Sequence, residues 1–365
     1  MDLSGISVIR SIEKGRRIME TKQEREVWLD YMKAIACLSV LTFHVIYGIE
    51  NAGLPCSDLL LNIKRVCGTF QIPVFMFASG YLYGKKPIKN YGVFWGRKLI
   101  NLGIPYVIFS VVYYLVNVTF SSSVNFSYIP DQLIEIYEYP LAQYWYLFAL
   151  LLLFLGVPVL EWILQNEWML LAFFIGWKVV NSCWISITNY DYFFAQYAIY
   201  FYMGAIYCRH HTQFSFKEEK KSALFLAGIV FLVLLFCRYF VNWDEYGKSY
   251  SIIEIFCAVL SIYLMSSYFE KRGEKAGNWF LKVVSRYSFQ IYLLHTMATA
   301  AVRIVLQKVG VTVEIVHLIV GFVVGLCVSC FVAFTCEKSV VLNLFFFPEG
   351  TIKKIKKLRA EKKSQ

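Results

Sequence analysis

Charged side chains are scarce in this chain of 365 residues. Lys, Arg, Asp and Glu together make up 17% of it, whereas about a quarter of an ordinary soluble domain is charged. Hydrophobic residues reach 58% and aromatic residues 18%. A chain with so few polar side chains cannot cover a globular surface in water, so the composition excludes a soluble enzyme and predicts a membrane protein.

The sequence also lacks a recognisable leader, linker or internal repeat. Lys and Arg are scattered through the first 25 residues, unlike a cleaved signal peptide, so we expect the first long apolar helix to direct membrane insertion. We predict one membrane domain over residues 28–337. A basic cytoplasmic arm over 1–27 precedes it, and a basic cytoplasmic tail over 338–365 follows it.

The ten cysteines do not form the pattern of a disulfide framework. Most of them lie inside apolar stretches, where a thiol packs like a small hydrophobic side chain. Cys327 and Cys330 form a C-x-x-C pair, but no second pair and no nearby His completes a metal site. The pattern therefore indicates packing, and no metal is expected.

Long apolar segments recur along almost the whole chain. A bilayer core is about 30 Å thick and needs roughly 20 apolar residues per helix. This predicts an all-α, polytopic helix bundle with about ten transmembrane helices. The predicted spans are 28–49, 66–83, 99–120, 144–164, 168–187, 191–208, 222–241, 251–269, 281–306 and 315–336.

Positive charge alternates between the loops that join these spans. The loops after the second, sixth and eighth spans are rich in Lys and Arg, whereas residues 50–62 and 121–143 contain none and 307–314 contains only Lys308. The positive-inside rule then puts both termini in the cytoplasm. We interpret the net charge of +11 as a signal of topology and lipid contact, and not of nucleic-acid binding.

The first span carries ionisable side chains along one face. Lys33 and His44 are eleven residues apart, which is a rotation of about 20° and a rise of about 16 Å along a helix. Asp30 and Cys37 share that face, so the four side chains predict a polar stripe that lines a cavity. The alternative for Asp30 and Lys33 is that they mark the cytoplasmic interface. His44 is the stronger functional candidate, because an ionisable group within a membrane span is functional by default.

A second polar stripe follows the ninth predicted span. Ser288, Tyr292, His295 and Thr299 recur at helical spacing. His295 either orients a substrate, supports His44, or makes an ordinary hydrogen bond between helices. The remaining histidines, which we expect to be solvated or interfacial, are His210, His211 and His317.

Two segments resemble known motifs. The stretch 28–44, with Lys33, ten residues and then His44, is similar to the first helix of the membrane acyltransferase family 3, where Arg or Lys precedes His by this spacing. The stretch 72–81 resembles the second-helix segment of that family. The weaker matches that follow in the family's order are Arg97 and Lys98 before Pro105, Trp145 to Leu147, Ser288 with Ile291 to His295, and Glu337.

The resemblance covers about residues 25 to 340, with three departures. Lys33 stands where Arg is commoner, Asn101 where a second basic residue is often found, and Ser339 where Pro often follows the Glu. These departures concern the contacts to phosphate more than the reaction class.

The resemblance implies an acyltransferase in the inner or plasma membrane of a bacterium. Such enzymes transfer a small acyl group, often acetyl, from cytoplasmic acyl-coenzyme A to a hydroxyl of a surface polysaccharide, such as an exopolysaccharide, or of its lipid-linked precursor. Acyl-coenzyme A (acyl-CoA, with acetyl-CoA the simplest case) is then a co-substrate, and no permanently bound cofactor is expected. The partners are acyl-CoA, the glycan and membrane lipids.

The resemblance and the residue chemistry assign roles together. A neutral imidazole accepts a hydroxyl proton near neutral pH, so His44 is the candidate general base, with a transient acyl-His as the alternative. Lys33 and His295 are candidates for supporting that step. Arg97 and Lys98 are candidates for binding the coenzyme A phosphates. The candidates for substrate binding are Trp145, Asp30 and Glu337.

A different class of function also fits polar stripes inside a membrane. A carrier for a polysaccharide or a lipid-linked sugar would use intramembrane His and charges as a proton relay. Carriers commonly consist of repeated halves or have helices broken at matching positions, and the sequence shows neither. The acyltransferase is therefore the preferred hypothesis.

Overall fold

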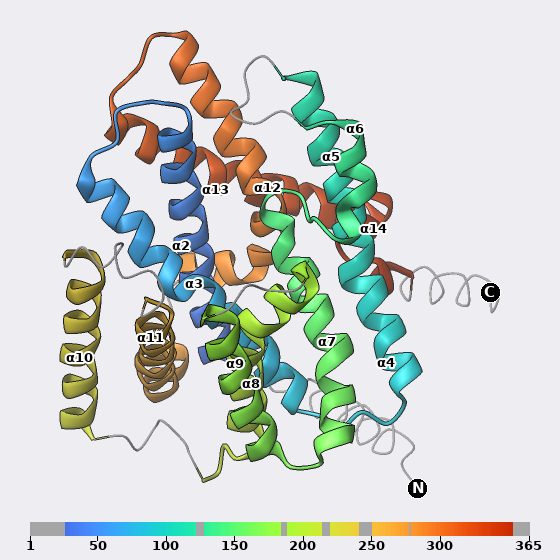
Figure 1. Cartoon of the computed structure of the whole chain (residues 1–365). Helices are drawn as coiled ribbons and strands as arrows, with labels where there is room; N and C mark the ends of the chain where they lie inside the picture. The colour runs from blue at the N-terminus through green and yellow to red at the C-terminus, as the bar shows by residue number, and fades with distance from the viewer. Residues whose placement is uncertain are drawn as a thin grey trace, which may run out of the picture.

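A computed structural model describes residues 26–121, 128–183, 188–213, 220–240, 250–276 and 279–352. This part of the chain is helical and contains no strand (Figure 1). The longer helices are α2 (Val27–Asn51), α3 (Asp58–Gly84), α4 (Tyr91–Lys98), α5 (Ile104–Thr119), α7 (Trp145–Leu164), α8 (Glu167–Cys183), α9 (Asn189–Arg209), α10 (Lys221–Phe240), α11 (Tyr250–Arg272), α12 (Trp279–Lys308) and α13 (Glu314–Lys338). The shorter ones are α6 (Pro130–Ile134) and α14 (Val340–Phe346).

Each predicted apolar segment coincides with a helix over its described residues, which confirms the all-α class for this part of the chain. Residues 184–187 and 241 of the predicted spans lie outside the described residues. The largest shift is in α3, which starts at Asp58, eight residues before the predicted span. In the described part of the chain, six helical stretches are long and apolar enough to cross a membrane. They are Val27–Asn51, Tyr91–Thr119, Pro130–Leu164, Ile253–Arg272, Trp279–Lys308 and Glu314–Lys338. The protein is therefore a multi-pass membrane protein.

Helices α2, α3 and α12 form the centre of the bundle. α2 packs against both α3 and α12, α3 packs against α9, and α13 covers α12. α10 lies at one edge against α11 (Figure 1). The helix that carries His44 is thus enclosed by other helices, and its side chains form much of the core.

Helices α3 and α9 cross with their backbones almost in contact. A Cβ atom at Gly80 would lie 1.7 Å from the carbonyl oxygen of Phe201, and one at Gly204 would lie 2.0 Å from that of Phe77. No Cβ fits at such distances, so only glycine permits the crossing. Gly80, within the second-helix motif, therefore has a packing role, as small residues commonly do between membrane helices.

Two glycines of α13 bring it close to the helices that carry the histidines. A Cβ atom at Gly325 would lie 2.7 Å from Cγ2 of Thr299 on α12 and 2.8 Å from Leu41 on α2. At Gly321 it would lie 3.0 Å from Val45. This close approach holds α2 and α12 together beside His44.

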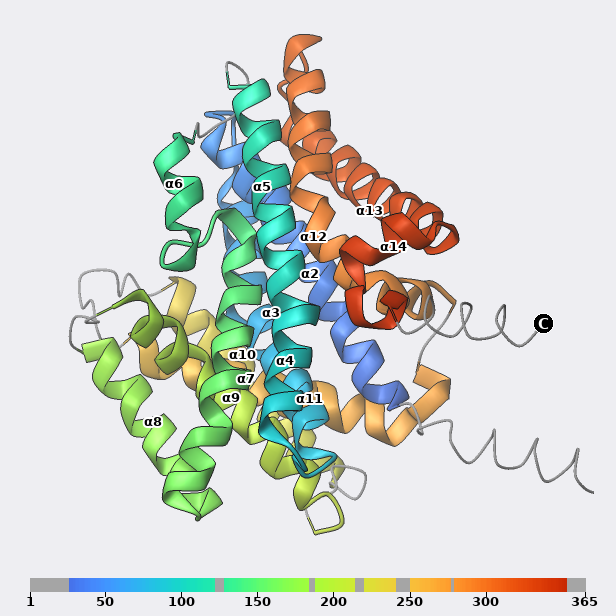
Figure 2. The ribbon, with the colours of Figure 1, turned by 90° about the vertical axis from the view of Figure 1, so that its right-hand side faces the viewer.

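The bundle has two distinct ends (Figure 2). The C-terminal ends of α2, α5 and α12 lie together at the top of the view, and those of α3, α7 and α9 lie at the bottom. Basic residues follow α3 and end α9, among them Lys85, Lys86 and Arg209. We call the bottom the basic end and the top the opposite end.

Candidate active site

Two histidines from α2 and α12 meet inside the bundle. The ring centroids of His44 and His295 are 5.0 Å apart, and the ring planes are inclined by 58°. His44 lies about 26 Å along α2 from Val27 but only about 10 Å from Asn51, at 1.5 Å per residue. The pair is therefore nearer the opposite end than the basic end.

The hydrogen bonds of His295 define its tautomer. Its side chain is fully buried, and Nδ1 lies 2.8 Å from the carbonyl oxygen of Ile291 and 2.9 Å from that of Tyr292. Because both neighbours only accept, Nδ1 carries the proton and Nε2 keeps a lone pair. Nε2 has no hydrogen-bond partner among the described residues.

His44 has aromatic neighbours but no hydrogen bond to the described residues. The rings of Phe43 and Tyr47 lie edge-on to its imidazole, at 5.3 and 6.4 Å between centroids. The side chain is half-buried and lines two cavities. Its ring nitrogens are thus available to a ligand in a way that those of His295 are not.

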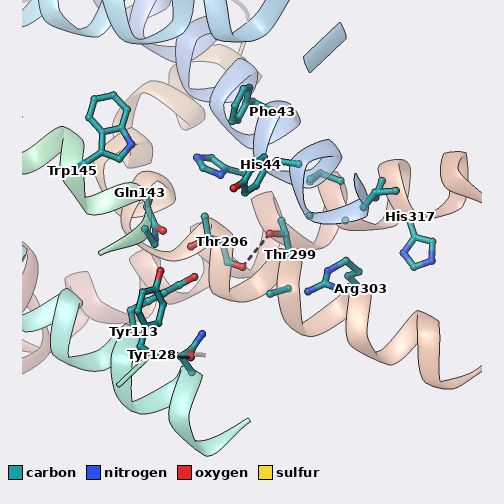
Figure 3. A pocket seen from close by; sticks show the side chains of 18 residues that line it. Phe43, His44, Tyr113, Tyr128, Gln143, Trp145, Thr296, Thr299, Arg303 and His317 are labelled. Carbon is teal, nitrogen blue, oxygen red and sulfur yellow. Dashed lines mark hydrogen bonds between the residues drawn. The ribbon is translucent and has the colours of Figure 1, made fainter. Parts of the chain in front are cut away.

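The first cavity, of about 350 Å³, opens between α2, α5, α7, α12 and α13 (Figure 3). Its polar lining includes His44, Gln143, Thr296 and Arg303. The side-chain amide of Gln143 and the hydroxyl of Thr296 are buried without a hydrogen-bond partner among the described residues. Buried polar atoms are normally satisfied, so these point to a ligand or to water in the cavity.

The second cavity has a similar size, about 360 Å³, and shares one wall with the first. The shared residues are Phe43, His44, Gln143 and Trp145. Lys178 on α8 and Glu254 on α11 also line it. The Lys178 ammonium group donates to Gln196 Oε1 at 2.5 Å, so this buried cation is satisfied within the protein.

The shared wall is held by a short turn before α7. The hydroxyl of Tyr292 donates to the Gln143 carbonyl at 2.7 Å, and that of Tyr144 donates to the Leu293 carbonyl at 3.0 Å. These bonds tie the turn to α12 beside His295. Trp145 follows it and stacks on Phe193 and Tyr197, at 5.9 and 5.3 Å between centroids, as part of an aromatic wall.

The other predicted site residues do not join this group. None of Asp30, Lys33, Arg97, Lys98 and Glu337 lines either cavity. Asp30 and Lys33 pair with each other at 2.7 Å, Arg97 pairs with Glu349 at 3.3 Å, and Glu337 pairs with Arg286 at 2.8 Å. The Lys98 ammonium group lies 3.4 Å from the centre of the Phe154 ring.

The predicted stripe on α2 is therefore not continuous. Cys37, between Lys33 and His44, is buried in a cluster with residues of α12 and α13, and its thiol faces the Ser288 carbonyl at 3.8 Å. Helical periodicity gives the direction of each side chain correctly but does not tell which neighbouring helix covers it. Only the His44 end of the stripe borders a cavity.

Several cavity residues were missed by the sequence analysis. Lys178, Glu254 and Arg303 all fall within predicted spans, so the rule that singled out His44 also applies to them. Gln143 carries no such signal, because an amide before a predicted span is unremarkable in sequence.

The prediction that three histidines are solvated or interfacial was wrong in part. His317 is buried, donates from Nε2 to the Val311 carbonyl at 2.9 Å, and lines the first cavity. His210 and His211 are half-buried and pair with Glu167 and Glu270, respectively. In the described part of the chain, no group of three His, Cys, Asp or Glu side chains is arranged to hold a metal ion.

The site can now be compared with known proteins. A family model described as an acyltransferase domain matches residues 26–336. The chain belongs to the acyltransferase 3 family. Membership identifies an acyltransferase enzyme, which uses an acyl donor and an acceptor. No curated protein and no solved structure matches the chain.

Family membership bears on the competing reading of the polar stripes. The match covers His44, His295 and all the residues that line the two cavities. The match is to an acyltransferase domain, so it favours acyl transfer over the carrier hypothesis.

Proposed function

We propose that this acyltransferase 3 protein moves a small acyl group, acetyl in the simplest case, from acyl-coenzyme A to a hydroxyl of a surface polysaccharide or a lipid-linked sugar. The observation that carries the proposal is His44, whose ring nitrogens have no partner among the described residues and which borders two cavities. We further propose ten membrane spans with both termini in the cytoplasm.

The transfer requires one proton acceptor and no redox step. His44 takes the proton of the acceptor hydroxyl while its oxygen attacks the thioester carbonyl carbon. The carbon–oxygen bond of the ester forms, the carbon–sulfur bond breaks, and the thiolate of coenzyme A leaves. The proton on His44 then passes to that thiolate, which restores the neutral imidazole.

His295 is better suited to a positioning role than to direct attack. It is fully buried and lines neither cavity, so a substrate cannot reach it. Its Nδ1–H bonds to backbone carbonyls fix the ring against His44. The fixed ring of His295 favours a single orientation of the His44 imidazole. In many proton-transfer sites a further residue orients the base in this way.

The donor phosphates are proposed to bind at the basic end. Of the candidates there, Lys98 has no carboxylate within 4.0 Å among the described residues, whereas Lys33 and Arg97 are paired with Asp30 and Glu349. Lys33 lies eleven residues, or about 16 Å, before His44 on α2. The pantetheine arm then has to run along the bundle to bring the thioester to His44.

The acceptor is proposed to lie against the wall that the cavities share. Trp145 presents a rigid aromatic face, held by its stacks on Phe193 and Tyr197, and sugar rings pack on such faces. The unpartnered Gln143 amide beside it offers both a donor and an acceptor to hydroxyl groups. An apolar wall with a few convergent polar groups is typical of small-molecule sites.

Transfer of label from radiolabelled acetyl-coenzyme A to cell-envelope glycans tests the proposal. Membranes with the unchanged chain are compared with His44→Gln, which keeps the side-chain volume but removes the base. We expect transfer to fall by about 100-fold or more. Thr42→Ala is the matched control, because Thr42 bonds only to its own helix and lines neither cavity.

Each result has a defined meaning. Transfer that survives His44→Gln would remove His44 from the mechanism. If the unchanged chain transfers no acetyl group, longer acyl donors are tested next, and failure with these would contradict the proposed substrates.

A further inference from the structure

Arg303 is a buried cation that the proposed chemistry does not use. It lies on α12, eight residues after His295 and so about 12 Å further toward the opposite end. Its side chain is 7% exposed and lines the first cavity, and Figure 3 shows it pointing toward the side where Tyr113 lies.

The guanidinium group has few partners in the protein. Its Nη1 donates to Gln307 Oε1 at 3.2 Å, and the hydroxyl of Tyr113 is close enough to interact with it electrostatically. Among the described residues, no carboxylate lies within 4.0 Å of it.

Other arginines of the same chain show what a satisfied guanidinium looks like. Arg209 faces Glu161 at 2.6 Å, and Arg286 faces Glu337 at 2.8 Å, although both are more exposed than Arg303. An unpaired cation inside a membrane span is unfavourable, and such groups commonly mark the path or site of a charged substrate. Arg303 is therefore poorly explained as a structural residue.

The cavity around Arg303 has further unpartnered polar groups. The Gln143 amide and the Thr296 hydroxyl are buried without a partner among the described residues, and both line the same cavity as Arg303 and His44. Thr296 lies between Arg303 and Gln143 in Figure 3, and Gln143 lies on the side of Trp145. The cavity is thus lined by one cation, two neutral polar groups and the proposed base.

We infer that the first cavity binds an acidic sugar, whose carboxylate or phosphate group pairs with Arg303 while its reacting hydroxyl faces His44. Arginine matches both anions with two parallel hydrogen bonds, which would fix the acceptor's direction in the cavity. The inference rests on the proposed function, and it narrows the acceptor from any glycan to one with an anionic group.

Ligand-induced stabilisation tests this without relying on transfer. The melting temperature of the purified full-length protein is measured with millimolar D-glucuronate, D-glucose 1-phosphate or neutral D-glucose. We expect at least one acid, and not glucose, to raise the melting temperature of the unchanged protein. Stabilisation by glucuronate alone would identify a carboxylate as the group that Arg303 binds, and stabilisation by glucose 1-phosphate alone would identify a phosphate.

The variants locate the effect. In Arg303→Gln, we expect the half-saturating concentration of the acid to rise by about tenfold or more, because one partner of a buried ionic pair is removed. Lys308→Gln is the matched control: it removes a charge from the exposed end of the same helix and should respond like the unchanged protein. Arg303→Lys keeps the charge and replaces Arg303→Gln in this test if the glutamine variant does not fold. We expect its half-saturating concentration to rise less than that of Arg303→Gln.

Three results would overturn the inference: glucose stabilising as well as the acids, neither acid stabilising, or the Arg303 variants binding like the unchanged protein. Absence of acyl transfer in the unchanged chain would contradict the proposed function and leave this binding result standing. The two failures are thus separate.

Discussion

At the scale of single residues, the two histidines of the site differ in what their nitrogens can do. His295 donates from Nδ1–H to backbone carbonyls, its Nε2 has no partner among the described residues, and its ring centroid lies 5.0 Å from that of His44. His44 is open to two cavities. One imidazole is thus held by the protein, and the other borders the space that we propose the substrates occupy.

The variant His295→Asn separates support of His44 from support of the fold. The asparagine amide can replace the Nδ1–H donor, but it has no counterpart of Nε2 beside His44. We expect kcat to fall by about tenfold or more, with the KM values of donor and acceptor unchanged and with nearly the same melting temperature. Steady-state kinetics and a thermal melt measure this.

A structural role alone would give the opposite pattern. In that case His295→Asn would retain kcat, and only His295→Ala, which also loses the bonds to the Ile291 and Tyr292 carbonyls, would be destabilised.

The sequence shows which side chains are ionisable inside a predicted span, but it does not show which side chains of other helices contact them. The cost of an ionisable group in a membrane identified His44, and it applies equally to Arg303 and Lys178. The sequence could not tell that Lys178 is satisfied by Gln196 whereas Arg303 faces a cavity, because those partners lie on other helices. Gln143 gave no signal at all.

At the scale of helices, the crossing of α3 and α9 is the most exacting contact. Gly80 lies against the Phe201 backbone, so a methyl group there can only be accommodated if the helices move apart. Side chains can change rotamer to relieve a clash, but a backbone carbonyl cannot. The position of α3, and with it one wall of the second cavity, depends on this contact.

We expect Gly80→Ala to destabilise the protein by about 3 kcal/mol, at the upper end of the usual cost of overpacking. Thermal unfolding followed by size-exclusion chromatography in detergent measures the loss. Gly176→Ala on α8 is the matched control, since a Cβ there meets no atom within 4 Å. Equal melting of the two variants would show that the crossing is looser than described.

The existence of the helices followed from apolar windows, but their internal irregularities did not. The predicted span 99–120 is preceded by α4 and interrupted by a π-helical turn at Leu99–Gly103. Asn101 lies in this turn and donates to Glu349 at 2.7 Å. A π turn is a local change of the hydrogen-bond pattern from i→i+4 to i→i+5, which the hydropathy of the segment does not record.

At the scale of the whole molecule, the Lys and Arg residues that follow α3 and end α9 lie at the basic end, in accord with the proposed orientation. Cys56, between α2 and α3, lies at the opposite end and is half-buried. Burial, together with the carboxylates of Glu314 and Glu50, raises the pKa of its thiol. The thiolate is the reactive form, so alkylation should be slow at neutral pH and accelerate as the pH rises.

A membrane-impermeant maleimide applied to intact spheroplasts therefore tests the orientation. We expect it to label the chain, more rapidly at higher pH, and to leave Cys56→Ser unlabelled under the same conditions. Labelling of Cys56 that appears only after the membrane is opened would reverse the proposed topology.

The number of membrane crossings is where sequence and structure agree least. Six described stretches meet the length and hydropathy of a span, whereas the proposed topology uses ten. α3 and α9 do not meet that measure because polar and aromatic side chains interrupt them, yet both are central to the bundle. Helices that pack on other helices need less lipid-facing surface, and we therefore propose that α3 and α9 cross the membrane as well.

The off-centre position of His44 along α2 bears on whether the cell needs a separate exporter for activated acyl groups. In the proposed orientation, coenzyme A approaches from the side of Val27, whereas the imidazole lies close to Asn51. Making the ester and carrying the acyl group across most of the membrane then become one event. The cell would need no separate exporter for an activated acyl group, and the spent coenzyme would stay on the side where it is recharged.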